Sequence, residues 1–269
     1  MERKHAKDNN SLHTFLSIIR IICVVVIIIC LIYIIQWYIE NRKNANMLKN
    51  IKDESIKDTK TISVLISDDE ITNPDIDQPS VVEIPVYELD FDKLFSINNN
   101  TVGWLTVPNT SIDYPVAKGQ DNSFYLNHSF DKSSNTAGWI FADYRNKFDG
   151  TDKNIIIYGH NRMDSSMFAT LKNTHKSSWY NNNKYVTVTT PNGTLVYEVF
   201  SLYTTPMESY YITTDFSNDT EYLNFLNTIK NRSIHDFGIK LDSSDKILTL
   251  STCDSSGKSR VVLHARQIN

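Results

Sequence analysis

The arrangement of apolar positions singles out one stretch near the N-terminus. Residues 15–39 are predominantly apolar, and residues 21–35 form an uninterrupted apolar run. A helix of roughly 20 such residues crosses a bilayer, and Trp37 and Tyr38 stand where an interfacial aromatic belt would lie. A cleaved signal peptide is the alternative, but its apolar core spans only about 7–15 residues and ends in small residues. Residues 36–47 (QWYIENRKNANM) offer no such cleavage site, so we expect an uncleaved membrane anchor at residues 15–39.

Polar segments lie on both sides of this anchor. Residues 1–14 would form a short tail, and residues 40–84 are rich in Asn, Lys, Asp, Ser and Thr, which predicts a polar stalk with some helix near the membrane. Basic residues are almost balanced between the two ends of the anchor, so charge does not decide its orientation. We infer a cytoplasmic tail and an extracellular domain from the chemistry of the remaining chain.

Residues 85–269 carry the period-two patterns of a β-rich domain. The clearest is a hairpin at residues 184–203 (KYVTVTTPNGTLVYEVFSLY), whose two alternating runs meet at Pro191-Asn192-Gly193. Further strands are expected at residues 102–117 (two strands with a turn at Pro108-Asn109), 137–143, 153–161, 246–253 and 260–268.

Two helices interrupt these strands. Residues 86–100 place Leu89, Leu94 and Phe95 at roughly helical spacing, and residues 217–233 predict an amphipathic helix before the last two strands. The second helix would bury Tyr222, Phe225, Leu226 and Ile229 on one face. We therefore expect a single mainly β domain with added helices. A closed or nearly closed barrel is favoured because it leaves no exposed sheet edge.

Charge and cysteine content narrow the function. The 269 residues carry a net charge of -4 and no Lys/Arg-rich run, which argues against nucleic-acid binding. Cys23 and Cys30 lie inside the apolar stretch, so Cys253 is alone in the remaining chain and has no intramolecular disulfide partner there. A free thiol outside the cell is a liability unless it has a use. Chemistry at Cys253 is therefore worth testing against its neighbours.

A catalytic cysteine needs an acid or base and a group that stabilises an oxyanion. If residues 246–253 and 260–268 pair across the DSSGKS loop, Cys253 lies opposite Arg260, while Arg266 lies roughly 20 Å further along the strand. His264 would lie roughly 13 Å from Arg260, which argues against its being the base.

The base must then come from another strand. His160 follows the apolar run NIIIYG at a strand end, where catalytic groups are often displayed. His128 is the second choice, and His175 and His235 lie in polar segments and are expected to be solvated. On spacing alone, a structural role in the core for Cys253 and a surface role for His160 remain open alternatives.

Several motifs together resemble one enzyme family. TLSTC (249–253) followed by RVV (260–262) resembles the signature of sortases, the membrane-anchored cysteine transpeptidases of Gram-positive bacteria. IIIYGHN (155–161) is similar to the family's histidine segment, and DYPVAKGQDNSFYLNHSFD (113–131) resembles class B sortases in particular. The resemblance covers about residues 85–269 and implies a sortase-like closed barrel of about eight strands, with an N-terminal helix and a helix before the last two strands.

The resemblance also assigns roles. It implies that Cys253 is the nucleophile, His160 the acid/base and Arg260 the oxyanion donor, and that no cofactor or metal takes part, since nothing resembles the calcium site of class A enzymes. The spacing between Cys253 and Arg260 is at the short end for the family, and His128 stays a candidate pocket residue. The implied substrate-binding residues are Ser251, Asn122, Leu126, Tyr211 and Ile212.

The expected function is therefore a cysteine transpeptidase. It would cleave a C-terminal sorting signal after Thr through a thioester and transfer the surface protein to an amine of a cell-wall peptide precursor. The alternatives are a sortase that polymerises pilins, a cysteine protease, and a membrane-anchored binding module with a structural cysteine. The sorting motif, the acceptor amine, the client proteins and the oligomeric state stay open.

Overall fold

The computed structural model describes residues 2–66, 80–253 and 258–269. The chain divides into two compact units, residues 1–46 and residues 47–269. The first unit belongs to one long helix, α1 (Glu2–Ser55), whose apolar side chains between residues 15 and 39 are almost all exposed. By length and composition, residues 15–55 form a helix that could cross a membrane, and a signal sequence near the N-terminus would pass the same test.

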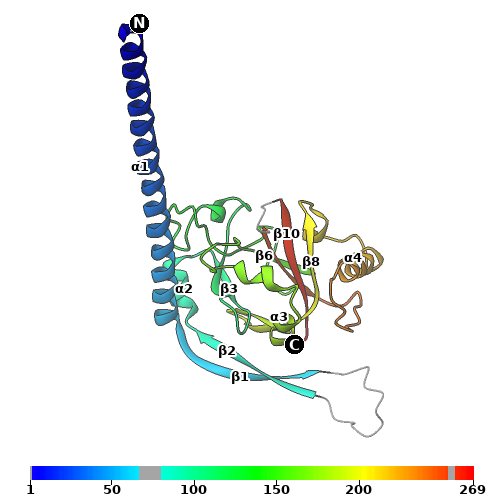
Figure 1. Ribbon diagram of the computed structural model, residues 1–269. Coiled ribbons are helices and arrows are strands. Elements are labelled where there is room, and N and C mark those ends of the chain that lie inside the picture. Colours follow the sequence, from blue (N-terminus) through cyan, green and yellow to red (C-terminus); the bar gives the residue numbers. More distant parts are fainter. Residues whose placement is uncertain (1, 67–79, 254–257) are drawn as a thin grey trace. The chain divides into compact units, whose positions relative to one another are not determined.

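The second unit is built around a closed barrel of eight strands in the order β10-β8-β7-β3-β4-β5-β6-β9 (Figure 1). The predicted closed barrel is therefore confirmed. Neighbouring strands are antiparallel except for the parallel pairs β4–β5 and β6–β9. The strands are β3 (Thr101–Thr106), β4 (Asp113–Lys118), β5 (Phe141–Ala142), β6 (Asn154–Tyr158), β7 (Tyr185–Thr190), β8 (Gly193–Pro206), β9 (Ile247–Cys253) and β10 (Ser259–Gln267).

Helices connect and cover these strands. In Figure 1, α4 lies beside β8, and its predicted apolar face is buried against that side of the barrel. The helix begins where the Asn218 side chain accepts a hydrogen bond from the backbone N–H of Glu221, an N-cap that fits the sequence. The helices are α2 (Phe91–Ile97), α3 (Ser177–Asn182) and α4 (Asp219–Asn231), with 3₁₀ turns at Phe124–Leu126, Ala169–Asn173 and Tyr210–Ile212.

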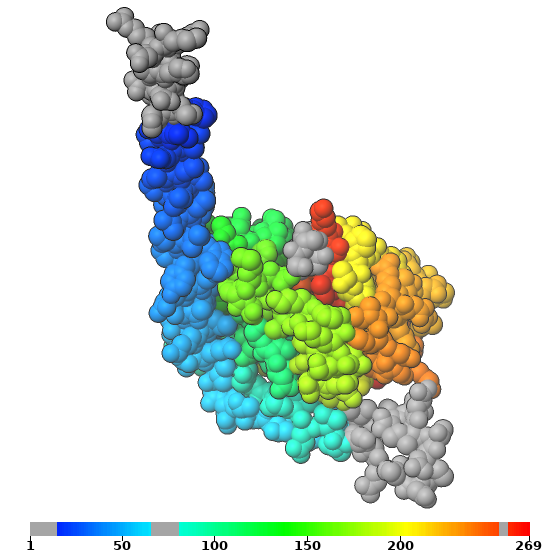
Figure 2. All heavy atoms as spheres, viewed as in Figure 1, coloured from blue at the N-terminus to red at the C-terminus, as the bar shows by residue number. Residues whose placement is uncertain are grey.

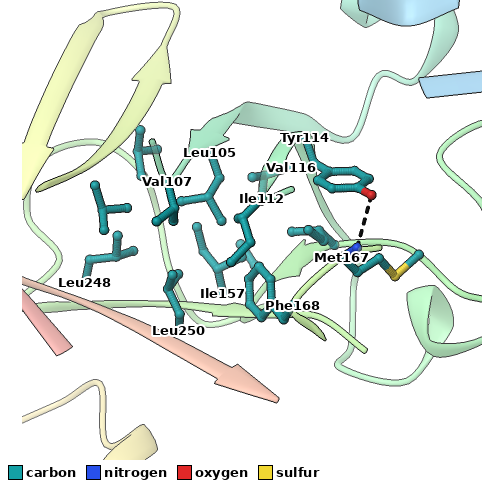
Figure 3. Packing of buried hydrophobic residues seen from close by; sticks show 14 of the residues in the cluster. Leu105, Val107, Ile112, Tyr114, Val116, Ile157, Met167, Phe168, Leu248 and Leu250 are labelled. Carbon is teal, nitrogen blue, oxygen red and sulfur yellow. Dashed lines mark hydrogen bonds between the residues drawn. The ribbon is translucent and has the colours of Figure 1, made fainter. Parts of the chain in front are cut away.

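The barrel interior is filled by aliphatic and aromatic side chains from every side (Figure 3). Leu105 of β3, Ile157 of β6 and Leu250 of β9 are each fully buried there. Because alternate residues of a strand face opposite sides, the period-two patterns supply this core directly. The Tyr114 hydroxyl accepts a hydrogen bond from the backbone N–H of Met167 at 3.1 Å, which ties the long β6–β7 connection to β4.

The structure differs from the expected stalk at residues 40–84. Helix α1 continues to Ser55, and β1 (Ile56–Ile66) pairs antiparallel with β2 (Ser80–Leu89). The second compact unit begins at residue 47, so the linker prediction was wrong for residues 47–66 and 80–84. The physical reason is burial, because Ile51 is only 2% exposed and Val64 and Ile84 pack together against the barrel strands.

A single carboxylate joins this extra layer to the barrel. Asp113 at the start of β4 accepts hydrogen bonds from Trp104 Nε1 at 2.7 Å and from the Tyr87 hydroxyl at 3.1 Å. Lys52 in the last turn of α1 forms a salt bridge with the same carboxylate at 2.5 Å. Burial, and then the negative charge of Asp113, raise the pKa of Tyr87 to about 12. Helix, hairpin and barrel thus meet at one residue.

Candidate active site

Four neighbouring strands bring the proposed catalytic positions to one level of the barrel. Arg260 of β10 is the direct partner of Cys253 of β9, as the sequence predicted, and on its other side Arg260 pairs with Thr205 of β8. Strand β6 runs parallel to β9 with Tyr158 opposite Ser251, and the next N–H of β6 donates to the Ser251 carbonyl at 3.3 Å. His160 and Cys253 each lie two residues beyond that pair, so they reach the same level.

A cavity of about 610 Å³ opens at this level. It contains every side chain that the resemblance assigned except Cys253, whose side chain lies outside the described part of the structure. The predicted residues that line it are His160, Arg260, Ser251, Asn122, Leu126, Tyr211 and Ile212. Their roles stay predictions, but the fold brings together residues from five separate segments of the chain.

His160 is held at the cavity by a backbone contact. Its Nε2 lies 2.9 Å from the carbonyl oxygen of Leu126, so Nε2 carries the proton in this arrangement. Gly138 makes the close approach possible, because its φ is +62° and a Cβ there would lie 2.9 Å from His160 Cδ2 and 2.7 Å from the Leu126 carbonyl oxygen. A side chain at residue 138 would push the imidazole away.

Arg260 is half-buried at the opposite side of Cys253. Its Nη1 donates to the carbonyl oxygen of Ser259 at 3.1 Å, and no carboxylate in the described part of the chain forms an ion pair with it. A guanidinium that is not neutralised keeps donors free for a substrate oxygen. His160 and Arg260 line one cavity from either side of the Cys253 level, which is the arrangement that acyl transfer requires.

A buried carboxylate fixes one wall of the cavity. Asp143 is fully buried and accepts hydrogen bonds from Arg145 Nε and Nη2 at 2.8 and 2.7 Å, from Asn122 Nδ2 at 2.9 Å and from the Tyr158 hydroxyl at 2.8 Å. Burial alone would raise the pKa of Asp143, but the hydrogen bonds from Arg145 outweigh it and the pKa is lowered. Arg145 also donates to the Ile212 carbonyl oxygen at 2.9 Å.

The other wall is fixed by hydroxyl and amide groups. The Tyr211 hydroxyl lies 2.9 Å from Ser251 Oγ, and both side chains are buried. Asn154 Nδ2 donates to the Thr213 carbonyl oxygen at 2.9 Å. The segment that carries Tyr211 and Ile212 is therefore held from below by β6 and β9, so the cavity wall is preorganised.

His264 is excluded from the site, as its distance along the strand predicted. It is fully buried outside the cavity, where its Nδ1 donates to Thr249 Oγ1 at 2.8 Å and its Nε2 accepts from the Tyr203 hydroxyl at 2.9 Å. Thr249 in turn donates to Asn154 Oδ1 at 2.7 Å, which fixes the tautomer. Burial lowers the pKa of His264 to about 3, so the ring is neutral.

The other histidines are also outside the cavity. His128 was a candidate pocket residue, and this was wrong, because its ring stacks on Phe124 and its Nδ1 lies 2.8 Å from the Phe124 carbonyl oxygen. His175 is exposed, as expected, whereas His235 is partly buried against Tyr180. His160 is thus the one histidine among the described cavity-lining residues.

The sequence analysis missed several residues of the cavity. Tyr158 shares a strand face with His160 by period-two spacing, so the pattern could have identified it. Glu208 carried no such signal, because its segment reaches the cavity only through the pairing of β8 with β10. The missed lining residues are Phe141, Tyr158, Gly159, Met207, Glu208, Ser209 and Thr252.

Comparisons with known proteins agree with this architecture. The sortase domain family matches residues 105–268. Sortase B of Staphylococcus aureus (strain NCTC 8325 / PS 47) is 33% identical over 257 residues, which cover 94% of this chain and 97% of that protein. Sortase B of Listeria monocytogenes serovar 1/2a (strain ATCC BAA-679 / EGD-e) is 38% identical over 180 residues, covering 65% of this chain and 72% of the relative.

A solved structure extends the similarity to the fold. The crystal structure of a Bacillus anthracis protein described as similar to sortase B has 35% identity and a TM-score of 0.68, and it covers 86% of this chain and 97% of that chain. Matching sequence over nearly the whole chain and a matching barrel together decide the family. The chain belongs to the class B sortases, a family of transpeptidase enzymes.

Proposed function

We propose that this sortase cleaves a C-terminal sorting signal after a threonine, holds the acyl group as a thioester on Cys253 and transfers it to an amine. One observation supports this most directly. Arg260 is the ladder partner of Cys253, while His160 reaches the same level on the other side and lines the same cavity as Arg260.

In the first step the Cys253 thiolate attacks the threonine carbonyl carbon. The guanidinium of Arg260 stabilises the oxyanion that develops, an effect typically worth about 10²–10³ in rate. His160 then gives a proton to the leaving amine as the peptide C–N bond breaks, which leaves the thioester.

In the second step an acceptor amine attacks the thioester carbon. The C–S electron pair returns to sulfur, the new C–N bond forms, and His160 takes up a proton from the nitrogen. Two solved structures similar to this chain support a peptide substrate and an amine acceptor: one is a Staphylococcus aureus sortase B–substrate complex, and another is a sortase B complexed with triglycine.

We further propose residues 15–39 as the membrane anchor, with residues 1–14 in the cytoplasm and the barrel outside the cell. The exposed apolar side chains of α1 support the anchor. Anchoring confines the enzyme to the surface where a membrane-bound client and a cell-wall precursor meet, which raises their effective concentration.

The test is intact mass spectrometry of the full chain in detergent micelles, mixed with peptides that contain Pro-x-Thr. We expect a covalent adduct that is absent in Cys253→Ala and that disappears when an amine is added. Rapid hydrolysis that does not depend on amine would indicate a protease instead. No adduct with any peptide, together with a Cys253 that resists alkylation, would overturn the proposal in favour of a binding module.

A further inference from the structure

One cavity-lining residue has no part in the steps above. Glu208 lies just after β8 and carries the only carboxylate among the described residues that line the cavity. Figure 2 shows the end of β8, in yellow, at the surface beside β10, in red. About a third of the Glu208 side chain is exposed, so a ligand in the cavity can reach it.

The carboxylate is fixed from one side only. Glu208 Oε1 accepts hydrogen bonds from Arg232 Nη1 and from Thr205 Oγ1, both at 2.5 Å. Arg232 is itself held, because its guanidinium lies over the ring of Tyr210 at 5.1 Å from the centroid. Glu208 Oε2 accepts no hydrogen bond from any residue in the described part of the chain, so one oxygen of a preorganised carboxylate stays available.

The strand order shows which part of a substrate this oxygen meets. Thr205, which holds Glu208, is the ladder partner of Arg260 on the side away from Cys253. His160 lies on the other side of Cys253, so the two strand positions are roughly 14 Å apart along the sheet at about 4.8 Å per strand. The reacting amine must reach His160 and therefore does not bind Glu208. Glu208 faces the acyl part of the substrate, whose carbonyl oxygen points to Arg260.

The surroundings favour a long cationic side chain. Met207 lines the cavity next to Glu208 and is 66% exposed, which offers an apolar surface for a methylene stem. Lysine and arginine bury such a stem against apolar groups and place the charged head on a carboxylate.

We propose that Glu208 selects sorting signals that carry a lysine or arginine on the amino side of the scissile threonine. This selection rests on the proposed function, since it concerns the peptide that acylates Cys253. The bound cation donates to Glu208 Oε2 while Oε1 keeps its bonds to Arg232 and Thr205.

The experiment measures kcat/KM of the full chain in detergent micelles for peptides with Lys, Gln or Glu at each of the three positions before the threonine. At one position we expect Lys to exceed Gln by about threefold to fivefold, as for a partly exposed ion pair, and Glu to fall below Gln. In Glu208→Gln this preference disappears, and in the wild type it weakens as ionic strength rises.

Glu198→Gln is the matched control, because Glu198 forms a comparable salt bridge with Arg266 on the same two strands but outside the cavity. It should keep the preference for Lys. If Glu208→Gln slows all peptides equally, or leaves the preference intact, Glu208 only holds the cavity wall and the selection is overturned. If no peptide acylates Cys253 at all, the proposed function fails, and this inference fails with it.

Discussion

Arg260 and Cys253 are direct partners in the β9–β10 ladder, and Arg260 has no ion-pair partner in the described part of the chain. An arginine in that position can give its donors to a substrate oxygen rather than to a carboxylate of the protein. The pairing follows from the length of one short connection, so the nucleophile and its proposed oxyanion donor are set by local geometry.

We expect Arg260→Ala to lower kcat by about 10²–10³, because the developing oxyanion loses its charged donor. Arg260→Lys should recover only part of this activity, since lysine keeps the charge but lacks the planar fork. The measurement is steady-state peptide cleavage. Arg266→Ala, at the far end of β10, serves as the control and should change kcat by less than about threefold. Equal effects of the two alanine variants would contradict the role of Arg260.

Gly138→Ala should reduce both stability and kcat. The new Cβ would meet the Leu126 carbonyl oxygen and the His160 ring, so the imidazole must move. Gly150→Ala is a matched control, because Gly150 also has a positive φ but no atom lies within 4 Å of the position that a Cβ would take there. Both variants should lose about 1–2 kcal/mol of stability from backbone strain, measured by urea unfolding. Only Gly138→Ala should also lose activity, and unchanged kcat in that variant would contradict the placement of His160.

Arg145→Lys should raise KM by roughly tenfold with a smaller change in kcat. The lysine cannot hold Asp143 through two bonds and also donate to the Ile212 carbonyl oxygen, so the cavity wall loosens. Steady-state kinetics give the split between KM and kcat, and the rate of Cys253 alkylation should not change. A fall in kcat at constant KM would show that the wall does not bind the peptide.

Stability should fall at acidic pH in part because of His264. Burial lowers its pKa from 6.5 to about 3, so the unfolded chain binds a proton that the folded chain does not. Its contribution to stability is complete above pH 6.5 and is lost as the pH falls toward 3, by up to a few kcal/mol. His264→Gln should flatten this part of the dependence in urea unfolding at pH 7 and pH 4. A variant that loses stability as steeply as the wild type would contradict this assignment.

The sequence by itself determined the elements whose pattern is local. The β7–β8 hairpin, the buried face of α4 and the pairing of Cys253 with Arg260 all followed from spacing within about 20 residues, because turn geometry fixes the register of adjacent strands. The motifs around Cys253 and His160 were sufficient to indicate the class B sortases.

Only the tertiary structure decided what depends on contacts between distant segments. The parallel pairing of β6 with β9 brings His160 to the level of Cys253 across about 90 residues of sequence, and no period in either strand encodes that pairing. The cavity position of Glu208 depends in the same way on β8 and β10. Residues 47–66 looked polar in sequence, yet Ile51 and Val64 are buried, because a few apolar side chains suffice when a folded barrel already offers the surface to cover them.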